Sequence, residues 1–584
     1  MPIELLLSDL DRREAVLPDV LPDGSVPFVT PLVPPNPFVF HGGNQRDSLA
    51  IQNWAIIVPR KAVILATWVQ SLADLRWAQS GQAVSRDRWI FPVDPGMSRA
   101  AAGVWRHEVL DRIRLERRPR YILILGDLDE VSLELQQELM TSAFVGRLCF
   151  KTDDGAPDRE GYRAYCDKVC ALERDRAWHD WRDDARFLFY ADRAPGECSL
   201  QIAYTDLVRQ SYSDAEADSD LPCAELLRFG HPGHPWQASD GDDAAAARSL
   251  LHWARDVHPS ILLSVSHGAG VCDDRQRKLQ GALMIHDART GEREVWDHSR
   301  FADRSFLPGG FWFLKACFGA GTPATSVYAH WLEQLTNQDL VRANPSIALQ
   351  YLARDGRGFL ARLPQVALAS PRGPLGVVSH VDLTWTFGFQ NPIGDPEHPM
   401  ASSGYSPYYD MLRMVAMGSR LGNALSSLSE RANEVATHLV QLYDEHQQHS
   451  SDVQRYHALR AWLWMQYLDL SGYVLLGDPA AQVPTAGARI ACEQDEMPRH
   501  HRRGNSAGVS DRAAFHQDPE AMATAVLRKL EGVGENLIAS ELGIATDLLR
   551  EWETVYREAG LAAMRALCST RTSHCGHLPN DESK

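Results

Sequence analysis

The sequence has 584 residues, which is more than one ordinary domain and predicts a chain of two to four domains. Its 76 acidic residues outnumber its 59 basic residues, and the net charge of −17 argues against non-specific binding to nucleic acid or anionic membranes. The ten cysteines are scattered, and neither a signal peptide nor the run of ~20 apolar residues that spans a membrane is recognisable. We therefore expect a cytoplasmic protein in a reduced compartment, without a membrane partner.

The first expected region, residues 1–117, should pack on the core that follows it. Residues 1–45 are rich in proline, and the segments AIIVP (55–59) and VILATW (63–68) are strand-like. The next region begins with YILILGDLDEV (121–131), a continuous apolar run that ends in Gly-Asp. Such a run is typical of a parallel strand buried on both faces of a sheet.

An alternation of strands and helices continues through residues 118–486. Apolar runs such as RFLFYAD, SILLSVS, GFWFLKAC and GPLGVVSH predict strands, and amphipathic segments such as EGYRAYCDKVCALERD predict helices between them. Residues 405–470 predict long helices, and YVLLG predicts a last strand. This pattern indicates an α/β domain with a mainly parallel sheet flanked by helices.

The C-terminal part predicts a different organisation. Residues 487–515 are polar and rich in Gly, Ser and Arg, which indicates a linker. Residues 516–567 predict a small all-α module with helix–turn–helix spacing that resembles transposase-like proteins, and residues 568–584 predict a flexible tail. The second helix of the module is net acidic, whereas a DNA-reading helix is normally basic, so we expect docking of a regulatory protein or dimerisation rather than nucleic-acid binding.

Two strand ends carry a pair of residues that could perform nucleophilic chemistry. His267 follows SILLSVS and Cys317 follows FWFLKA, and each is close to glycine. A cysteine at the end of an apolar strand is most often a small buried hydrophobic residue. If the two strands are neighbours, however, the imidazole and the thiol emerge at the same edge of the sheet, as the acid–base and nucleophile of a cysteine peptidase. The amides of Gly268 and Cys317 could then form an oxyanion hole.

The segments SVSHGAG, LKACFGAGTP, GVVSHVDLTW and YVLLGDPAAQVP resemble, in this order, the caspase-like cysteine peptidases of the gingipain and CHAT group. PRYILILGDLDEV and AFVGRLCF resemble two earlier strands of such domains, so the resemblance covers residues 118–486. It implies a caspase–haemoglobinase fold and thiol endopeptidase activity without a cofactor. It also implies that His267 and Cys317 are the catalytic dyad and that Trp385 covers the P1 side chain of the substrate.

The resemblance fails at the specificity pocket. The stretch GECSLQ places Ser199 where arginine-specific gingipains have an aspartate, so a preference for Arg or Lys is not implied. Asp192, Asp273 or Asp382 could supply the acid instead, and Asp382 is nearest to Trp385 in the sequence. The structural alternative is that these three are ordinary loop acids.

The resemblance also implies a regulated bacterial effector of defence or cell death, whose protein substrate could be a neighbouring effector such as a gasdermin. Two other function classes stay open: a catalytically inactive peptidase-like scaffold, and a regulator that binds DNA or a partner through the helix–turn–helix. No metal site is expected. Cys166 and Cys170 are more consistent with the buried face of a helix, His231 and His234 lie in a proline-rich loop, and CSTRTSHCGH (568–577) lacks a second ligand pair.

Overall fold

The computed structural model describes most of residues 46–485 and a few residues outside this range. The gaps are 82–88, 175–185, 193–197, 222–224, 230–249, 256–258, 287–292, 303, 338–344, 391–403 and 449–452, and the additional residues are 8–9, 14–15, 546 and 550. The chain divides into two compact units, Met1–Glu496 and Met497–Lys584. The expected linker, helix–turn–helix and tail therefore lie almost entirely outside the described residues, as do His231 and His234.

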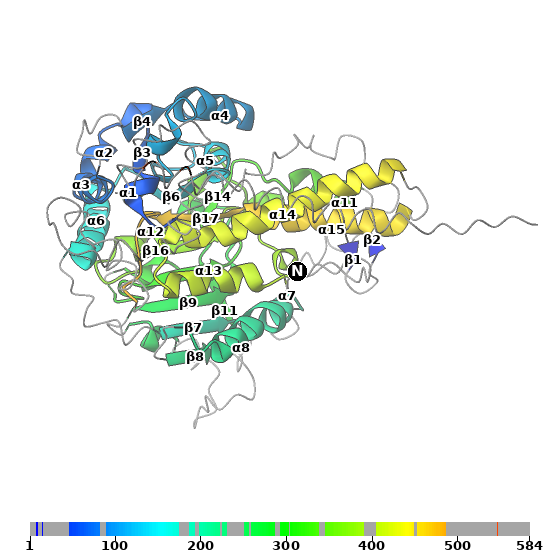
Figure 1. Cartoon of the computed structure of the whole chain (residues 1–584). Helices are drawn as coiled ribbons and strands as arrows, with labels where there is room; N and C mark the ends of the chain where they lie inside the picture. Colours follow the sequence, from blue (N-terminus) through cyan, green and yellow to red (C-terminus); the bar gives the residue numbers. More distant parts are fainter. Residues whose placement is uncertain are drawn as a thin grey trace, which may run out of the picture. The chain divides into compact units, whose positions relative to one another are not determined.

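One large sheet organises the first unit (Figure 1). Its strand order is β4-β3-β5-β6-β17-β16-β13-β9-β7-β8. The bounds are β3 (Trp54–Pro59), β4 (Ile90–Val93), β5 (Tyr121–Leu125), β6 (Phe144–Leu148), β7 (Arg186–Ala191), β8 (Glu225–Phe229), β9 (Ser260–Val265), β13 (Phe311–Lys315), β16 (Gly376–His380) and β17 (Tyr473–Gly477). The expected α/β class with a mainly parallel sheet is confirmed.

Every neighbouring pair in this sheet is parallel except β16 and β17. The sheet therefore consists of two parallel halves that run in opposite directions and meet at that pair. As a result, the carboxyl ends of β16, β13, β9, β7 and β8 lie together at one edge, and those of the other five strands lie at the opposite edge. The residues expected to carry chemistry follow strands of the first group.

The strands are buried on both faces, which explains their continuous apolar sequences. In β5, Tyr121, Leu123 and Leu125 belong to one hydrophobic cluster, whereas Ile122 and Ile124 belong to another on the opposite face. Alternate residues of a strand point to opposite faces, so a run without polar positions fits a strand that is covered twice.

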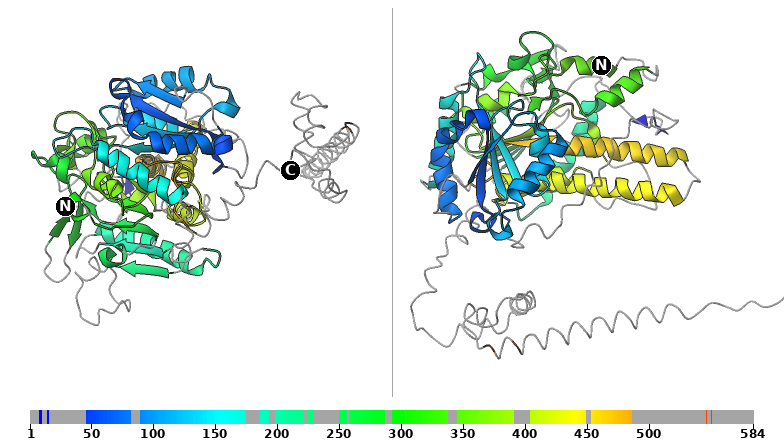
Figure 2. Two further views of the ribbon diagram at one scale, coloured as in Figure 1. Left: turned by 90° about the vertical axis from the view of Figure 1, so that its left-hand side faces the viewer. Right: turned by 90° about the horizontal axis from the view of Figure 1, so that it is seen from above.

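Helices cover both faces and connect the strands. They are α1 (Leu49–Gln52), α2 (Leu65–Trp68), α3 (Gln70–Gln79), α4 (Arg99–Trp105), α5 (Leu133–Met140), α6 (Arg159–Arg174), α7 (Cys198–Ala203), α8 (Arg209–Ala217), α10 (Gln276–Leu279), α11 (Ala329–Asn337), α12 (Arg362–Ala369), α13 (Ser406–Ala416), α14 (Leu421–Gln448) and α15 (Val453–Ser471). The last two pack against each other and extend beyond the sheet (Figure 2). None of the helices in the described ranges has the length and apolar character to cross a bilayer.

Several smaller elements complete the unit. They are the 3-10 helices η2 (Arg60–Ala62), η5 (Leu115–Arg117), η9 (His298–Arg300), η10 (Pro345–Tyr351) and η11 (Thr386–Gly388), the π-helices η4 (Arg106–Leu110) and η8 (Tyr204–Val208), and the short strands β1 (Ser8–Asp9), β2 (Glu14–Ala15), β10 (His267–Gly268), β11 (Leu283–His286), β12 (Arg293–Trp296), β14 (Gly321–Thr322) and β15 (Phe359–Leu360). β10, β11 and β12 form an antiparallel sheet of three strands.

Two local expectations can be compared with these elements. VILATW was expected to be strand-like, and this prediction is wrong: the chain leaves β3 at Pro59 through a 3-10 helix and enters α2. Val63 and Ile64 are 45% and 57% exposed, whereas Leu65 and Ala66 are buried, so the apolar residues do not alternate between two covered faces. The expectation that Cys166 and Cys170 lie on the buried face of a helix is confirmed, since both are buried free thiols in α6.

Candidate active site

The two strands that precede His267 and Cys317 are neighbours in the sheet. β9 and β13 pair in parallel, and Val265 is the partner of Lys315 at the last paired position of both strands. The amide of Ser266 also donates a hydrogen bond to the carbonyl of Lys315, at 3.2 Å. His267 and Cys317 therefore each stand two residues beyond the same pair, and both leave the sheet at its carboxyl edge, so the condition set in the sequence analysis is met.

Gly268 brings the segment that follows His267 into direct contact with the backbone of Cys317. A Cβ atom on Gly268 would lie 1.9 Å from the carbonyl oxygen of Cys317 and 3.1 Å from its nitrogen, so only glycine fits. Gly268 lies opposite Leu283 in the β10–β11 pair, and the next residue, Ala269, donates to the carbonyl of Ala282. Because hydrogen-bonded and non-bonded pairs alternate in an antiparallel ladder, the amide of Gly268 points away from β11.

The amide of Cys317 is the other donor expected for an oxyanion hole. In the described part of the chain, no backbone carbonyl accepts a hydrogen bond from it, whereas the following amide of Phe318 donates to the carbonyl of Asp382 at 2.8 Å. The loop after the thiol is thus fixed to the end of β16 while the Cys317 amide is not used by the backbone. The two expected donors, Gly268 and Cys317, adjoin each other.

The Cys317 thiol is partly buried and contacts the backbone of Thr384. The amide of Thr384 donates to Sγ at 3.5 Å, and Sγ donates to the Thr384 carbonyl at 3.7 Å. Burial raises the pKa of the thiol to about 11, although the Thr384 amide and the nearby Lys315 ammonium act in the opposite direction. The thiol is therefore protonated at neutral pH in this state.

A buried polar cluster that the sequence reading missed lies directly beneath this contact. Nζ of Lys315 donates to Oγ1 of Thr384 at 2.8 Å and to the hydroxyl of Tyr473 at 2.6 Å, and it lies 3.5 Å from Oδ2 of Asp469. Oδ1 of Asp469 accepts hydrogen bonds from Oγ1 of Thr384 at 2.9 Å and from the amide of Trp385 at 2.6 Å. The only sequence signal for this cluster is a lysine that interrupts the apolar run FWFLKA.

The electrostatics of this cluster are balanced locally. Burial lowers the pKa of Lys315, and the Asp469 carboxylate counteracts part of that effect. The ammonium also lies over the rings of Phe389 and Tyr473, at 5.1 and 5.3 Å from their centroids, which favours the charged form.

On the histidine side, Asp192 holds a second histidine next to His267. Oδ2 of Asp192 lies 2.5 Å from Nδ1 of His286, and Oδ1 accepts from the His286 amide at 2.9 Å. The rings of His286 and His267 are 6.5 Å apart between centroids. Asp192 and His286 are both buried. The carboxylate that was a candidate for the specificity pocket therefore serves His286.

Trp385 and Ser199 belong to adjacent elements. Trp385 is half-buried against the ring of Tyr328, with centroids 5.6 Å apart, and it directly precedes η11. η11 packs against α7, the helix that contains Ser199. Oγ of Ser199 is buried and has no hydrogen-bond partner among the described residues. The segment that begins with Trp385 and the helix that contains Ser199 are therefore neighbours in the fold.

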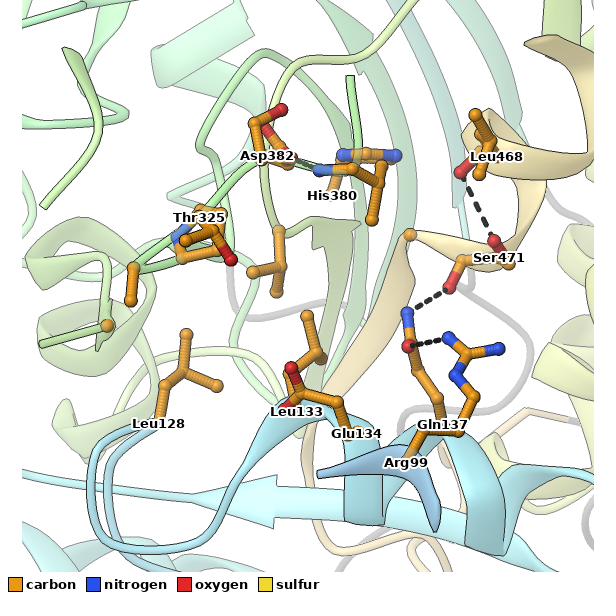
Figure 3. Close-up of a pocket in the computed structure, with 17 residues that line it drawn as sticks. Arg99, Leu128, Leu133, Glu134, Gln137, Thr325, His380, Asp382, Leu468 and Ser471 are labelled. Carbon is orange, nitrogen blue, oxygen red and sulfur yellow. Dashed lines mark hydrogen bonds between the residues drawn. The ribbon is translucent and has the colours of Figure 1, made fainter. Parts of the chain in front are cut away.

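Asp382 faces a cavity that neither Cys317 nor Trp385 lines (Figure 3). Oδ1 accepts from the Leu383 amide at 2.7 Å, and Oδ2 accepts from the Val327 amide at 3.2 Å. The cavity measures about 220 Å³, and Arg99 and Glu134 also contribute to its wall. Burial raises the pKa of Asp382 to about 7. The carboxylate of Asp382 thus serves two backbone amides at the wall of this cavity, and its carbonyl accepts the hydrogen bond of the Phe318 amide.

The remaining candidate acid is on the surface. Asp273 is exposed and forms an ion pair with Arg275 at 2.7 Å, as expected of an ordinary loop acid. Within the described ranges, no three His, Cys, Asp or Glu side chains are arranged to hold a metal ion.

Comparison of the chain with protein-family models, curated proteins and solved structures finds no match.

Proposed function

We propose that the protein is a cysteine endopeptidase in which Cys317 is the nucleophile and His267 the general acid–base. The observation that carries this proposal is the parallel pairing of β9 and β13, which places both residues at equal distance beyond one pair of strand ends. The close approach of Gly268 to the Cys317 backbone supports it, since it places both candidate oxyanion donors at the same point.

The proposed chemistry has two stages. His267 takes the proton of the Cys317 thiol, and the thiolate attacks the scissile carbonyl carbon, while the amides of Gly268 and Cys317 stabilise the oxyanion. His267 then protonates the leaving amine and a thioester forms. In the second stage His267 activates a water molecule, which hydrolyses the thioester and regenerates the thiol. The Asp192–His286 pair beside His267 would help to keep its ring in place.

The large, mostly parallel sheet flanked by helices is consistent with the caspase–haemoglobinase fold that the resemblance implies. We further infer a cytoplasmic, regulated effector that cleaves a protein substrate, with Trp385 and Ser199 in the P1 pocket. The helix–turn–helix module that the sequence predicts at residues 516–567 would dock a regulatory protein. The effector role and the P1 pocket follow from the sequence resemblance, whereas the compartment and the docking role follow from the cysteine usage and the net acidic charge of the C-terminal module.

One observation favours the alternative of an inactive scaffold. The Thr384 backbone contacts the Cys317 thiol and burial raises its pKa to about 11, whereas nucleophilic cysteines are activated by a lowered pKa. A peptidyl electrophile, such as an acyloxymethyl ketone, separates the two functions because it alkylates a thiol only after binding as a substrate.

A peptidase should be labelled at Cys317 by one or more members of a set with varied P1 residues, and labelling should disappear in Cys317→Ala and His267→Ala. Cys272→Ala is the matched control, because Cys272 is an exposed thiol outside the site, and it should be labelled like the wild type. Absence of Cys317 labelling by every member of the set would favour the scaffold.

A further inference from the structure

The segment that follows β16 covers the candidate nucleophile. Both backbone polar groups of Thr384 are directed at Sγ of Cys317, at 3.5 and 3.7 Å. A substrate carbonyl has to approach the same sulfur atom. The contact therefore describes a resting arrangement in which the chain itself occupies the surroundings of the thiol.

This segment is tied to the core by a single side-chain hydroxyl and one amide. Oγ1 of Thr384 is bonded to Lys315, to Asp469 and, at 2.9 Å, to the hydroxyl of Tyr473, and the amide of Trp385 is bonded to the same Asp469 carboxylate. Lys315 and Asp469 are 5% and 0% exposed at their side chains, so their charges are compensated by each other and by these bonds rather than by water. Hydrogen bonds to buried charged groups are among the stronger ones in proteins.

The two anchoring residues come from structurally rigid positions. Lys315 is the last residue of β13, in the centre of the sheet, and Asp469 lies near the end of α15. Tyr473, at the start of β17, fixes Lys315 from a third direction through its hydroxyl. Because Lys315 and Asp469 belong to β13 and α15, movement of the 384–385 segment away from these elements breaks its bonds to them.

Resting on the proposed function, we propose that Lys315, Asp469 and the Thr384 hydroxyl form a buried clamp that holds the Thr384 backbone on the Cys317 thiol. Lys315 and Asp469 are then positioning residues, which act on the nucleophile through Thr384. The clamp keeps the thiol covered at rest, and productive binding of a substrate has to displace it.

The test compares two substitutions at Thr384. Thr384→Val keeps the shape of the side chain and removes the hydroxyl, whereas Thr384→Ser keeps the hydroxyl. The readout is the rate at which iodoacetamide alkylates Cys317 in the full-length protein at pH 8, followed by mass spectrometry of the peptide that contains this residue. Iodoacetamide does not depend on substrate recognition, so the rate reports only on the exposure and ionisation of the thiol.

We expect the rate at Cys317 to rise roughly tenfold in Thr384→Val, which corresponds to about 1.4 kcal/mol, and to stay at the wild-type value in Thr384→Ser. Exposed Cys272 serves as the internal reference and should react equally in all proteins. A wild-type rate in Thr384→Val, or an equal rise in Thr384→Ser, would overturn the clamp.

The buried thiols of Cys149, Cys166 and Cys170 report whether each variant is folded. If these thiols react in Thr384→Val, Asp469→Asn replaces it as the deciding variant. We expect the same tenfold rise of the rate at Cys317 in Asp469→Asn, and a wild-type rate would overturn the clamp.

The clamp and the peptidase assignment can fail separately. If iodoacetamide alkylates Thr384→Val faster but no peptidyl electrophile labels Cys317, the clamp is supported and the peptidase assignment is refuted. If a peptidyl electrophile labels Cys317 but the alkylation rate of Thr384→Val equals that of the wild type, the peptidase assignment is supported and the clamp is refuted.

Discussion

At the scale of single residues, the close approach of the two backbones decides which residue type fits at position 268 beside Cys317. Gly268 has no room for a side chain, because a Cβ atom would lie 1.9 Å from the Cys317 carbonyl oxygen. The positions of Gly268, His267 and Cys317 at strand ends could be predicted from the sequence, since each follows an apolar run. The Lys315–Asp469 pair could not, because the two residues are far apart in the chain and only the folded sheet brings them together.

Gly268→Ala should therefore displace the Cys317 backbone. We expect the free energy of unfolding to fall by about 1–3 kcal/mol, as for other overpacked sites, and the labelling of Cys317 by a peptidyl electrophile to be lost. Gly103→Ala is the matched control, because its nearest neighbour would be 3.8 Å from the new Cβ. Denaturant unfolding and labelling measure both effects, and wild-type labelling of Gly268→Ala would contradict the proposed packing.

His380 gives a prediction about pH. It is completely buried, and burial lowers the pKa of its imidazole to about 4 from the ordinary value of 6.5. A depressed pKa stabilises the folded state above pH 6.5, and this stabilisation is lost as the pH falls toward 4. We expect His380 to account for a loss of about 2 kcal/mol of unfolding free energy between pH 7 and pH 5.

His380→Gln should remove that part of the pH dependence, because glutamine does not titrate in this range. Denaturant unfolding of both proteins at pH 7 and pH 5 measures the difference. Equal losses in the wild type and the variant would show that His380 is not the group responsible.

At the scale of elements, the pairing of β9 with β13 fixes the positions of His267 and Cys317 relative to each other. The strands themselves could be predicted, because each is a short apolar run bounded by glycine or a polar residue. The pairing of β9 with β13 and the reversal of direction between β16 and β17 could not be predicted. The order and direction of strands depend on contacts between segments that are distant in the sequence. The strand expected at VILATW is a helix for a different, local reason, since an apolar run of this length fits a short helix as well as a strand.

Trp312 connects these two strands through a buried hydrogen bond from Nε1 to Oγ of Ser264, at 2.8 Å. Trp312→Phe should lower the free energy of unfolding by about 1–3 kcal/mol, because it leaves the serine hydroxyl without its partner. Adding Ser264→Ala to this variant removes the unpaired hydroxyl and should recover part of the loss. Additive effects of the two substitutions in a double-mutant cycle would show that the bond does not couple the strands.

At the scale of the whole first unit, a buried charge network ties the segment before residue 118 to the end of β17. Asp478, which follows β17, accepts hydrogen bonds from Nε1 of Trp54 at 3.1 Å and from Nε of Arg76 at 2.7 Å. Arg76 also pairs with Glu173. Trp54 and Arg76 precede residue 118, so the segment expected to pack on the core contributes strands to the same sheet and charges to its centre.

Asp478→Ala should cost about 3–5 kcal/mol of unfolding free energy, because it leaves the buried guanidinium of Arg76 with only one of its two carboxylates. Asp94→Ala is the matched control: it breaks the solvent-exposed pair with Arg60 and should leave the stability nearly unchanged. Thermal unfolding of the two variants compares them directly. Similar small losses in both would mean that the network does not hold the segment before residue 118 on the core.

The central claim is that Cys317 and His267 hydrolyse peptide bonds, and a peptide library tests it most directly. Wild-type protein, Cys317→Ala, His267→Ala and the control Cys272→Ala are incubated with the library, and new termini are identified by mass spectrometry. We expect cleavage with a common P1 preference in the wild type and in Cys272→Ala, and none in the other two variants. Cleavage that persists in Cys317→Ala, or its absence from the wild type across the whole library, would contradict the assignment.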